Sequence, residues 1–183
     1  MDPLEIIERH YGGNPAALRV LVEHSRMVAA RALEIARSAA RAGLEADEGF
    51  VREAAMLHDI GIIGTRAPRL GCGGEDPYIR HGIIGRRMLE AEGLPRHALV
   101  CERHVGLGIS GEEVRLKGLP LPARDMVPVT LEEKIVCLAD KFYSKDGDPM
   151  REIPLEAVRR LVAGYGAGKL ETLERWLRDF GLS

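Results

Sequence analysis

The sequence has few aromatic residues and no marked excess of either charge. Phenylalanine, tryptophan and tyrosine together make up 4% of the 183 residues. Because aromatic side chains favour strands, a chain poor in them and rich in alanine, leucine, arginine and glutamate favours helices. The formal net charge of -2 gives no general attraction to nucleic acid or to an anionic membrane. Neither is an expected partner, and no basic stripe or aromatic platform suggests otherwise.

Cysteine is also scarce, and long apolar runs are missing. The chain has three cysteines, Cys72, Cys101 and Cys137, which form no C-x-x-C pair. We therefore expect reduced thiols rather than a zinc knuckle or a redox motif. No apolar stretch approaches the length that crosses a bilayer. The first residues are acidic where a signal peptide would be basic, so a cytoplasmic location is expected.

The sequence does contain frequent signals for the start of a helix. Asp2-Pro3 and Asn14-Pro15 each place a capping residue before a proline, and Thr130 to Glu133 has the pattern of a capping box. Apolar residues recur with a helical period after these starts, and no segment alternates long enough to predict a sheet. The expected helices cover about residues 3–12, 15–43, 47–60, 78–92, 95–105, 130–144, 154–163 and 169–180, with a long loop over 62–78. The pattern predicts an all-α single domain.

Histidines and aspartates interrupt the apolar faces of these helices. His24, for example, lies three residues after Leu21 and four before Val28, so it sits beside the apolar stripe of its helix. A carboxylate in such a position has a high desolvation cost unless a cation or several donors compensate it. The residues concerned are His24, His58, Asp59, His81, His104 and Asp140.

Each of these residues, taken alone, is more often structural than functional. Together they indicate a metal site, because five helices each deliver an inward histidine or aspartate. Imidazole and carboxylate bind Mn, Fe, Co, Ni and Zn, and a shared carboxylate can bridge two ions. His10 and His97 lie in a terminal helix and in a first helical turn, and we interpret both as structural.

The order of the six residues resembles the HD-domain superfamily of metal-dependent phosphohydrolases. The string LHDIG at 57–61 is similar to the HDIG subgroup, and RHGIIGRRML at 80–89 and CLADKFYS at 137–144 resemble its later motifs. The resemblance covers about residues 20–145. It implies an HD-type helical bundle over residues 1–146, with a C-terminal helical extension over 147–183 packed on the same domain.

The resemblance also implies a ligand set and its cofactors. One metal would take the equivalents of His24, His58, Asp59 and Asp140. The second would take Asp59 as a bridge, together with His81 and His104. The expected cofactors are two divalent transition-metal ions, with Fe or Mn as first candidates and Co, Ni, Zn or Mg as alternatives.

The chain departs from its relatives at two points. Many HDIG relatives have lysine directly after the HDIG glycine, whereas this chain has Ile62, so a phosphate contact made there by lysine is either absent or supplied from elsewhere. The paired histidines and the GYP string of the cyclic-di-nucleotide phosphodiesterase branch are also missing. That substrate is therefore not the expected one.

The expected activity is hydrolysis of a small phosphorylated substrate, with nucleotides among the usual class. Metal-activated hydroxide would attack phosphorus, with Asp59, Lys141 and Arg103 as catalytic residues. Lys141 comes first because the ADK triplet recurs in similar proteins. Arg80 and Arg66 are further phosphate-binding candidates, and the glycine-rich loop 61–74 is a candidate lid.

The sequence leaves open two other functions and the possibility of a homodimer. Some HD-fold proteins with a similar ligand set are di-iron oxygenases, and a non-catalytic module that binds a nucleotide or metal would carry the same residues. The C-terminal apolar residues are compatible with a homodimer interface, but they fit packing on the core equally well. These residues are Leu170, Leu173, Trp176 and Leu177.

Overall fold

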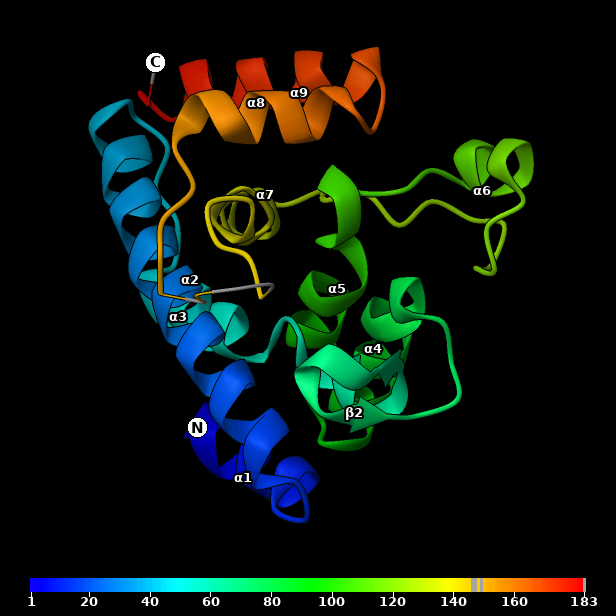
Figure 1. Ribbon diagram of the computed structural model, residues 1–183. Coiled ribbons are helices and arrows are strands. Elements are labelled where there is room, and N and C mark those ends of the chain that lie inside the picture. Colours follow the sequence, from blue (N-terminus) through cyan, green and yellow to red (C-terminus); the bar gives the residue numbers. More distant parts are fainter. Residues whose placement is uncertain (146–147, 149, 183) are drawn as a thin grey trace.

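Helices make up nearly all of the regular structure (Figure 1). The structure is a computed structural model that describes residues 1–145, 148 and 150–182. In this part of the chain the only sheet is a small antiparallel pair, in which β1 (Arg66–Ala67) pairs with β2 (Cys72–Gly73). The prediction of an all-α fold is confirmed.

The helix order follows the prediction, with shorter ends. The α-helices are α1 (Pro3–Tyr11), α2 (Pro15–Arg41), α3 (Glu48–Leu57), α4 (His81–Ala91), α5 (Pro95–Arg103), α6 (Gly111–Lys117), α7 (Leu131–Asp140), α8 (Leu155–Ala163) and α9 (Ala167–Asp179). The 3₁₀ helices are η1 (Ile60–Gly64), η2 (Pro68–Leu70), η3 (Tyr78–Arg80) and η4 (Val105–Leu107). Among the described helices, none combines the length and apolar character that a membrane crossing requires.

Capping side chains fix where several helices begin. Asp2 accepts a hydrogen bond from the backbone N–H of Leu4 at 2.9 Å, and the N–H of Ala17 donates to Asn14 at 3.2 Å. Such bonds satisfy amide groups that a helix start leaves without partners. Prolines at the first positions of α1 and α2 support the same starts.

Helix α7 passes through the middle of the molecule (Figure 1). Its residues 135–139 are fully buried, and they share one core cluster with residues of α2, α3, α8 and α9. A helix that is apolar on all sides is stable only when other elements surround it. Its last residue, Asp140, is consequently held inside the protein, with an exposed fraction of 7%.

The two C-terminal helices cover this core on one side (Figure 1). Leu173, Trp176 and Leu177 have exposed fractions of 0%, 4% and 0%. Of the two roles considered for them, a dimer interface or packing on the core, they therefore have the second. The predicted boundary between residues 146 and 147 lies outside the described residues, and the division into a core and an extension stays a prediction.

A tight contact after α3 turns the chain towards α4. We expected the third helix to reach Ile60, but α3 ends at Leu57 and the chain continues as η1. A Cβ atom at Gly61 would lie 2.1 Å from the carbonyl oxygen of His81 and 2.3 Å from the backbone nitrogen of Gly85. Only glycine permits so close an approach of two backbones. The contact places residues 58–59 beside the start of α4.

Two further expectations about segments were wrong. Residues 62–78 are not a plain loop, because they contain η1, β1, η2 and β2. Strands of two residues are too short to show alternation in a sequence. The helix expected over 130–144 ends at Asp140, since a later segment packs there: the N–H of Ile153 donates to the carbonyl of Phe142 at 2.7 Å.

Candidate metal centre

Six buried side chains from separate parts of the chain meet at the end of α7. Their ligand atoms form two groups, and within each group all atoms lie within 4.8 Å of one another. The first group is His24, His58, Asp59 and Asp140, and the second is Asp59, His81 and His104. The six residues have exposed fractions between 0% and 7%. These are the six residues that the sequence singled out, and the structure brings them together.

Three of the histidines are oriented by backbone carbonyl groups three residues before them in the chain. His58 Nδ1 lies 2.7 Å from the carbonyl oxygen of Ala55, and His81 and His104 make equivalent 2.7 Å contacts three residues upstream. A carbonyl can only accept, so Nδ1 donates in each case and the neutral ring carries its lone pair on Nε2. Helix ends therefore aim three ligand nitrogens at one point.

Asp59 lies at the centre, and its two oxygens face different groups. Oδ2 lies 3.0 Å from His58 Nε2 and 3.3 Å from His24 Nε2. Oδ1 lies 3.4 Å from His81 Nε2 and 3.4 Å from His104 Nε2. This division of a single carboxylate between two sets of imidazoles is the arrangement that a bridging ligand requires.

Asp140 completes the first group and faces the same two imidazoles. Its Oδ1 lies 3.2 Å from His24 Nε2 and 3.3 Å from His58 Nε2. Its other oxygen, Oδ2, accepts from the ammonium of Lys141 at 2.7 Å.

The cluster leaves polar atoms without adequate protein partners. His81 Nε2 and His104 Nε2 lie 3.1 Å apart, and in their neutral forms both present lone pairs, so no hydrogen bond can join them. Positive groups lie near Asp59, yet no described residue gives either of its oxygens a hydrogen bond of acceptable geometry. A buried carboxylate so poorly matched is costly unless a cation compensates it. The donor set therefore fits divalent metal ions.

The electrostatics favour the ligand forms of most of these groups. Burial lowers the pKa of His81 to about 3 and also lowers that of His104, which keeps both imidazoles neutral. Burial opposes the charge on Asp59, but His58 and Lys145 hold its carboxyl pKa well below the usual value. His58 is the exception: burial would lower its pKa, yet the charges of Asp59 and Asp140 raise it to about 9. A cation must therefore displace a proton from His58.

Lys145 is the residue that the sequence analysis missed. Its Nζ lies 2.6 Å from Asp59 Oδ2 and 3.7 Å from Asp140 Oδ1. We expected the last helix of the motif to continue to residue 144, which would have carried residue 145 away from Asp140. Because α7 ends at Asp140, the chain turns back and inserts this second lysine. The signal in the sequence was a second lysine four residues after Lys141, in a chain with few lysines.

The predicted arginines are placed differently from the lysines. Arg103 is not brought to the cluster, because its Nη1 donates to both carboxylate oxygens of Glu133 at 2.8 and 3.0 Å. Arg80 lies 2.9 Å from Asp76. Arg66 is exposed and lines the cavity beside the cluster. Arg103 is therefore dropped as a catalytic candidate, and Arg66 remains.

His10 and His97 lie outside the cluster, in line with their structural interpretation. His10 Nε2 lies 2.9 Å from Glu92, and His97 Nε2 lies 3.4 Å from Glu53. These contacts join helices away from the end of α7.

A cavity of about 720 Å³ opens beside the cluster. His81, His104, Asp140, Lys141 and Lys145 line it on the cluster side. Residues 66–70, within the glycine-rich loop, line it as well. A volume of this size suits a small-molecule ligand. The role of the loop as a lid stays a prediction.

A family comparison matches the chain to the HD domain over residues 21–144. Among curated proteins, an uncharacterized protein of Methanocaldococcus jannaschii is 40% identical over 123 residues, which are 67% of this chain and 65% of that protein. A tRNA (cytidine(56)-2'-O)-methyltransferase of Picrophilus torridus is 39% identical over 55% of this chain but only 26% of its own length. Its counterpart in Thermoplasma volcanium is 33% identical over 69% of this chain and 32% of its own length. The chain thus matches less than two thirds of each relative.

Solved structures show the same fold at low sequence identity. The HD domain of the L. monocytogenes phosphodiesterase PgpH is 16% identical, with a TM-score of 0.51 over 96% of this chain and 94% of that one. The same domain in complex with cyclic-di-AMP gives a TM-score of 0.52 at 15% identity, over 97% and 94% of the two chains. At such identities the likeness concerns the fold alone.

Proposed function

The chain belongs to the HD domain family, and from that membership and the geometry of the cluster we propose that it is a metal-dependent phosphohydrolase. Its substrate would be a small phosphate ester, and nucleotides are the first class to test. The observation that carries the proposal is the position of Asp59, with its two oxygens facing two separate groups of imidazoles. Membership of the narrower HDIG subgroup stays a prediction.

Each residue of the cluster has a role in this proposal. His24, His58 and Asp140 would hold one cation, His81 and His104 would hold a second, and Asp59 would be shared. Two divalent cations held there would supply positive charge to neutralise a phosphoryl group. They would also lower the pKa of a bound water to near neutrality. The N/O donor set accepts Mn, Fe, Co, Ni and Zn, so the ligands do not select one metal.

The lysines of the cavity wall supply further positive charge. Lys141 and Lys145 are both near the carboxylates and both line the cavity. Ammonium groups with little exposure bind phosphoryl oxygens strongly, because solvent screens them poorly. We propose that they orient the phosphate in the cavity, and that Arg66 contributes from the exposed side.

The names of the relatives do not extend this proposal to other reactions. The two methyltransferases share with this chain only a minor part of their own length, so we propose no methyl transfer. The cyclic-di-AMP complex belongs to a domain of 15% identity, and its ligand is one member of the substrate panel rather than the proposed substrate.

A substrate screen with defined metals tests the proposal. Metal-free protein is loaded separately with Mn, Fe, Co, Ni, Zn or Mg and incubated with nucleotides, cyclic dinucleotides and generic phosphate monoesters and diesters. Release of phosphate or of an alcohol that depends on the metal is the expected result. Dioxygen consumption without hydrolysis would instead indicate the oxygenase alternative. Metal binding with no turnover of any panel member would favour a non-catalytic module.

A further inference from the structure

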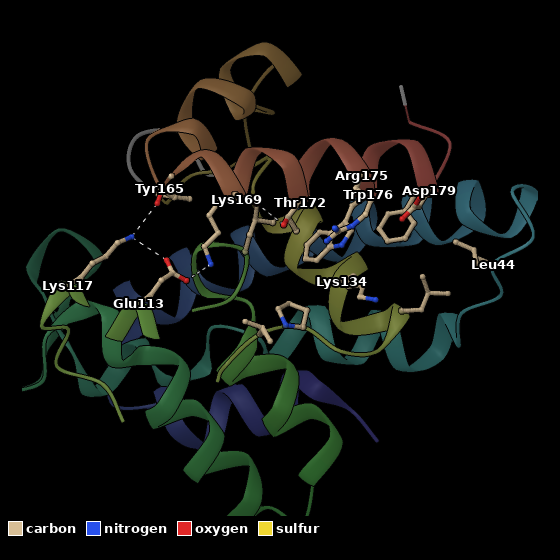
Figure 2. A pocket seen from close by; sticks show the side chains of 17 residues that line it. Leu44, Glu113, Lys117, Lys134, Tyr165, Lys169, Thr172, Arg175, Trp176 and Asp179 are labelled. Carbon is tan, nitrogen blue, oxygen red and sulfur yellow. Dashed lines mark hydrogen bonds and ion pairs between the residues drawn. The ribbon is translucent and has the colours of Figure 1, made fainter. Parts of the chain in front are cut away.

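A second, larger cavity lies away from the metal cluster (Figure 2). It has a volume of about 990 Å³ and lies between α9, the α6 region and the segment that leads into α7. Part of its wall is apolar and includes the side chains of Trp176 and Phe180. Nothing in the proposed hydrolysis uses this space.

The distribution of lysine singles out both cavities. The chain has 26 basic residues, but lysine occurs only at positions 117, 134, 141, 145 and 169. Lys141 and Lys145 line the cavity at the metal cluster. The other three line the second cavity. Every lysine of the chain thus lines one of these cavities, whereas only a few of the arginines do, among them Arg66 and Arg175.

Among the described residues, the basic groups of the second cavity form ion pairs at one end only. At one end Glu113 pairs with Lys169 at 2.7 Å and with Lys117 at 3.3 Å, so a single carboxylate faces two ammonium groups. At the other end, near Trp176, lie Lys134 and Arg175 (Figure 2). Neither has a carboxylate within ion-pair distance among the described residues. Asp179 lines the same end, so two basic groups and one carboxylate lie there beside an apolar wall.

The second cavity is connected to the metal cluster by a short segment of unusual backbone. His104 faces the cluster, and Leu107 lines the second cavity. Gly106, Leu107 and Gly108 have φ values of 58°, 63° and 82°. Left-handed backbone is unfavourable for leucine and is retained only where the surrounding structure imposes it.

One contact joins this segment to the wall of the second cavity. The ammonium of Lys169, in the wall of the second cavity, donates to the carbonyl oxygen of Gly108. Tyr165 lines both cavities. A ligand that moves Lys169 would act on the backbone that follows His104.

We propose that the second cavity binds a small organic phosphate, with the phosphate held by Lys134 and Arg175 and the organic part against Trp176. Ammonium and guanidinium groups without carboxylate partners are suited to phosphate oxygens, and the apolar wall accommodates the rest of the molecule. Occupation of this site acts on the metal cluster through residues 104–108. Binding itself does not depend on the proposed hydrolysis, whereas the coupling rests on metal binding at the cluster.

The fluorescence of Trp176 reports binding directly, because it is the only tryptophan. Metal-free protein is titrated with ADP, other nucleoside phosphates and sugar phosphates, and with inorganic phosphate as a probe without an organic part. A saturable change with the organic phosphates is expected. The double variant Lys134→Gln/Arg175→Gln should bind the same probe at least about tenfold more weakly, since it loses two charge-assisted contacts.

A matched control is Arg26→Gln/Arg87→Gln, which removes two exposed arginines elsewhere and should bind as the wild type does. Circular dichroism establishes that both variants are folded. The proposal is overturned if no organic phosphate changes the fluorescence, or if the Lys134/Arg175 variant binds as tightly as the wild type. It is also overturned if inorganic phosphate alone binds as tightly as every organic probe.

The coupling is measured as the affinity for Mn²⁺ with and without a saturating organic phosphate. A shift of at least about threefold is expected in the wild type and none in the Lys134/Arg175 variant. An unchanged affinity in the wild type would disprove the coupling. A protein that binds no Mn²⁺ would contradict the proposed function, while the fluorescence titration would still decide whether the second cavity binds its ligand.

Discussion

Two sets of buried carboxylates in this protein differ in how their charge is compensated. Glu102 and Glu133 have side-chain exposures of 1% and 5%. Glu102 accepts from Arg86 at 2.6 Å and from Arg124 at 2.8 Å, and Glu133 accepts from Arg103 at 2.8 Å. Guanidinium groups with fixed donors therefore satisfy both glutamates.

Asp59 and Asp140 are buried too, but over the described part of the chain their ion-pair partners are histidines and lysines rather than arginines. Their neighbours are imidazoles, several of which present lone pairs, and two flexible ammonium groups. Burial of a charge therefore does not by itself indicate function. The distinguishing feature is a carboxylate whose protein partners are insufficient and whose surroundings offer lone pairs to a cation.

The largest expected effect comes from Asp59→Asn, which keeps the shape of the shared ligand and removes its charge. Both metal ions should be lost, and hydrolysis should fall by at least about 10³-fold. Metal analysis and initial rates measure this, with circular dichroism to show that the fold is kept. Retention of both ions and full activity would mean that the assignment of the cluster is wrong.

His104→Ala separates the two groups of ligands. The variant should lose the ion shared by Asp59, His81 and His104 and keep the other, so metal content should fall by half. Activity should decrease by about 10²-fold or more, since one cation no longer neutralises the phosphoryl group. A variant with unchanged metal content would exclude the second group as a metal site.

Lys145→Gln tests the cation that lies on Asp59 in this structure. A divalent ion must displace the ammonium at 2.6 Å from Oδ2, so removal of the charge should tighten metal binding by about tenfold. The KM for the phosphate ester should rise at the same time. Calorimetric titration of metal-free protein measures the first effect; a weaker or unchanged affinity would contradict it.

Glu102→Gln should affect stability and leave metal content unchanged. Partly exposed arginines would lose a charged partner, at a cost of about 1–3 kcal/mol in the free energy of unfolding. Burial alone would raise the pKa of Glu102, but Arg124 and Arg86 lower it.

The lowered pKa of Glu102 determines how the difference in the free energy of unfolding between the wild type and Glu102→Gln depends on pH. The stabilisation by the carboxylate is fully present above the ordinary glutamate pKa of about 4.3 and is lost as the pH falls through the lower folded value. Denaturant unfolding of both proteins at pH 7 and in acid measures it. A difference in stability that grows in acid would contradict this account.

The sequence predicted the six clustered residues because their positions depend on local features. Histidines on apolar helix faces or at helix ends are visible as interruptions of a period, and Gly61 in the LHDIG string permits the contact with α4. The helix starts were predictable for the same reason, since caps and prolines act within one turn.

Tertiary contacts decided what the sequence could not predict. Lys145 reaches Asp59 only because α7 ends early, where residues 142 and 153 pair. Arg103 forms an ion pair with Glu133, 30 residues away in the chain, instead of reaching the cluster. A sequence shows both charges but not that they meet. The pairing of β1 with β2 involves two residues of each strand, too few for a periodic signal.

Anomalous diffraction from crystals of the Mn²⁺-loaded protein tests most directly whether Asp59 is shared by two metal ions. We expect two anomalous peaks, one on either side of the Asp59 carboxylate. The ion at one peak should be bound by His24, His58 and Asp140, and the ion at the other by His81 and His104. A single peak would contradict the shared carboxylate, and the absence of any peak at Asp59 would contradict the metal centre itself.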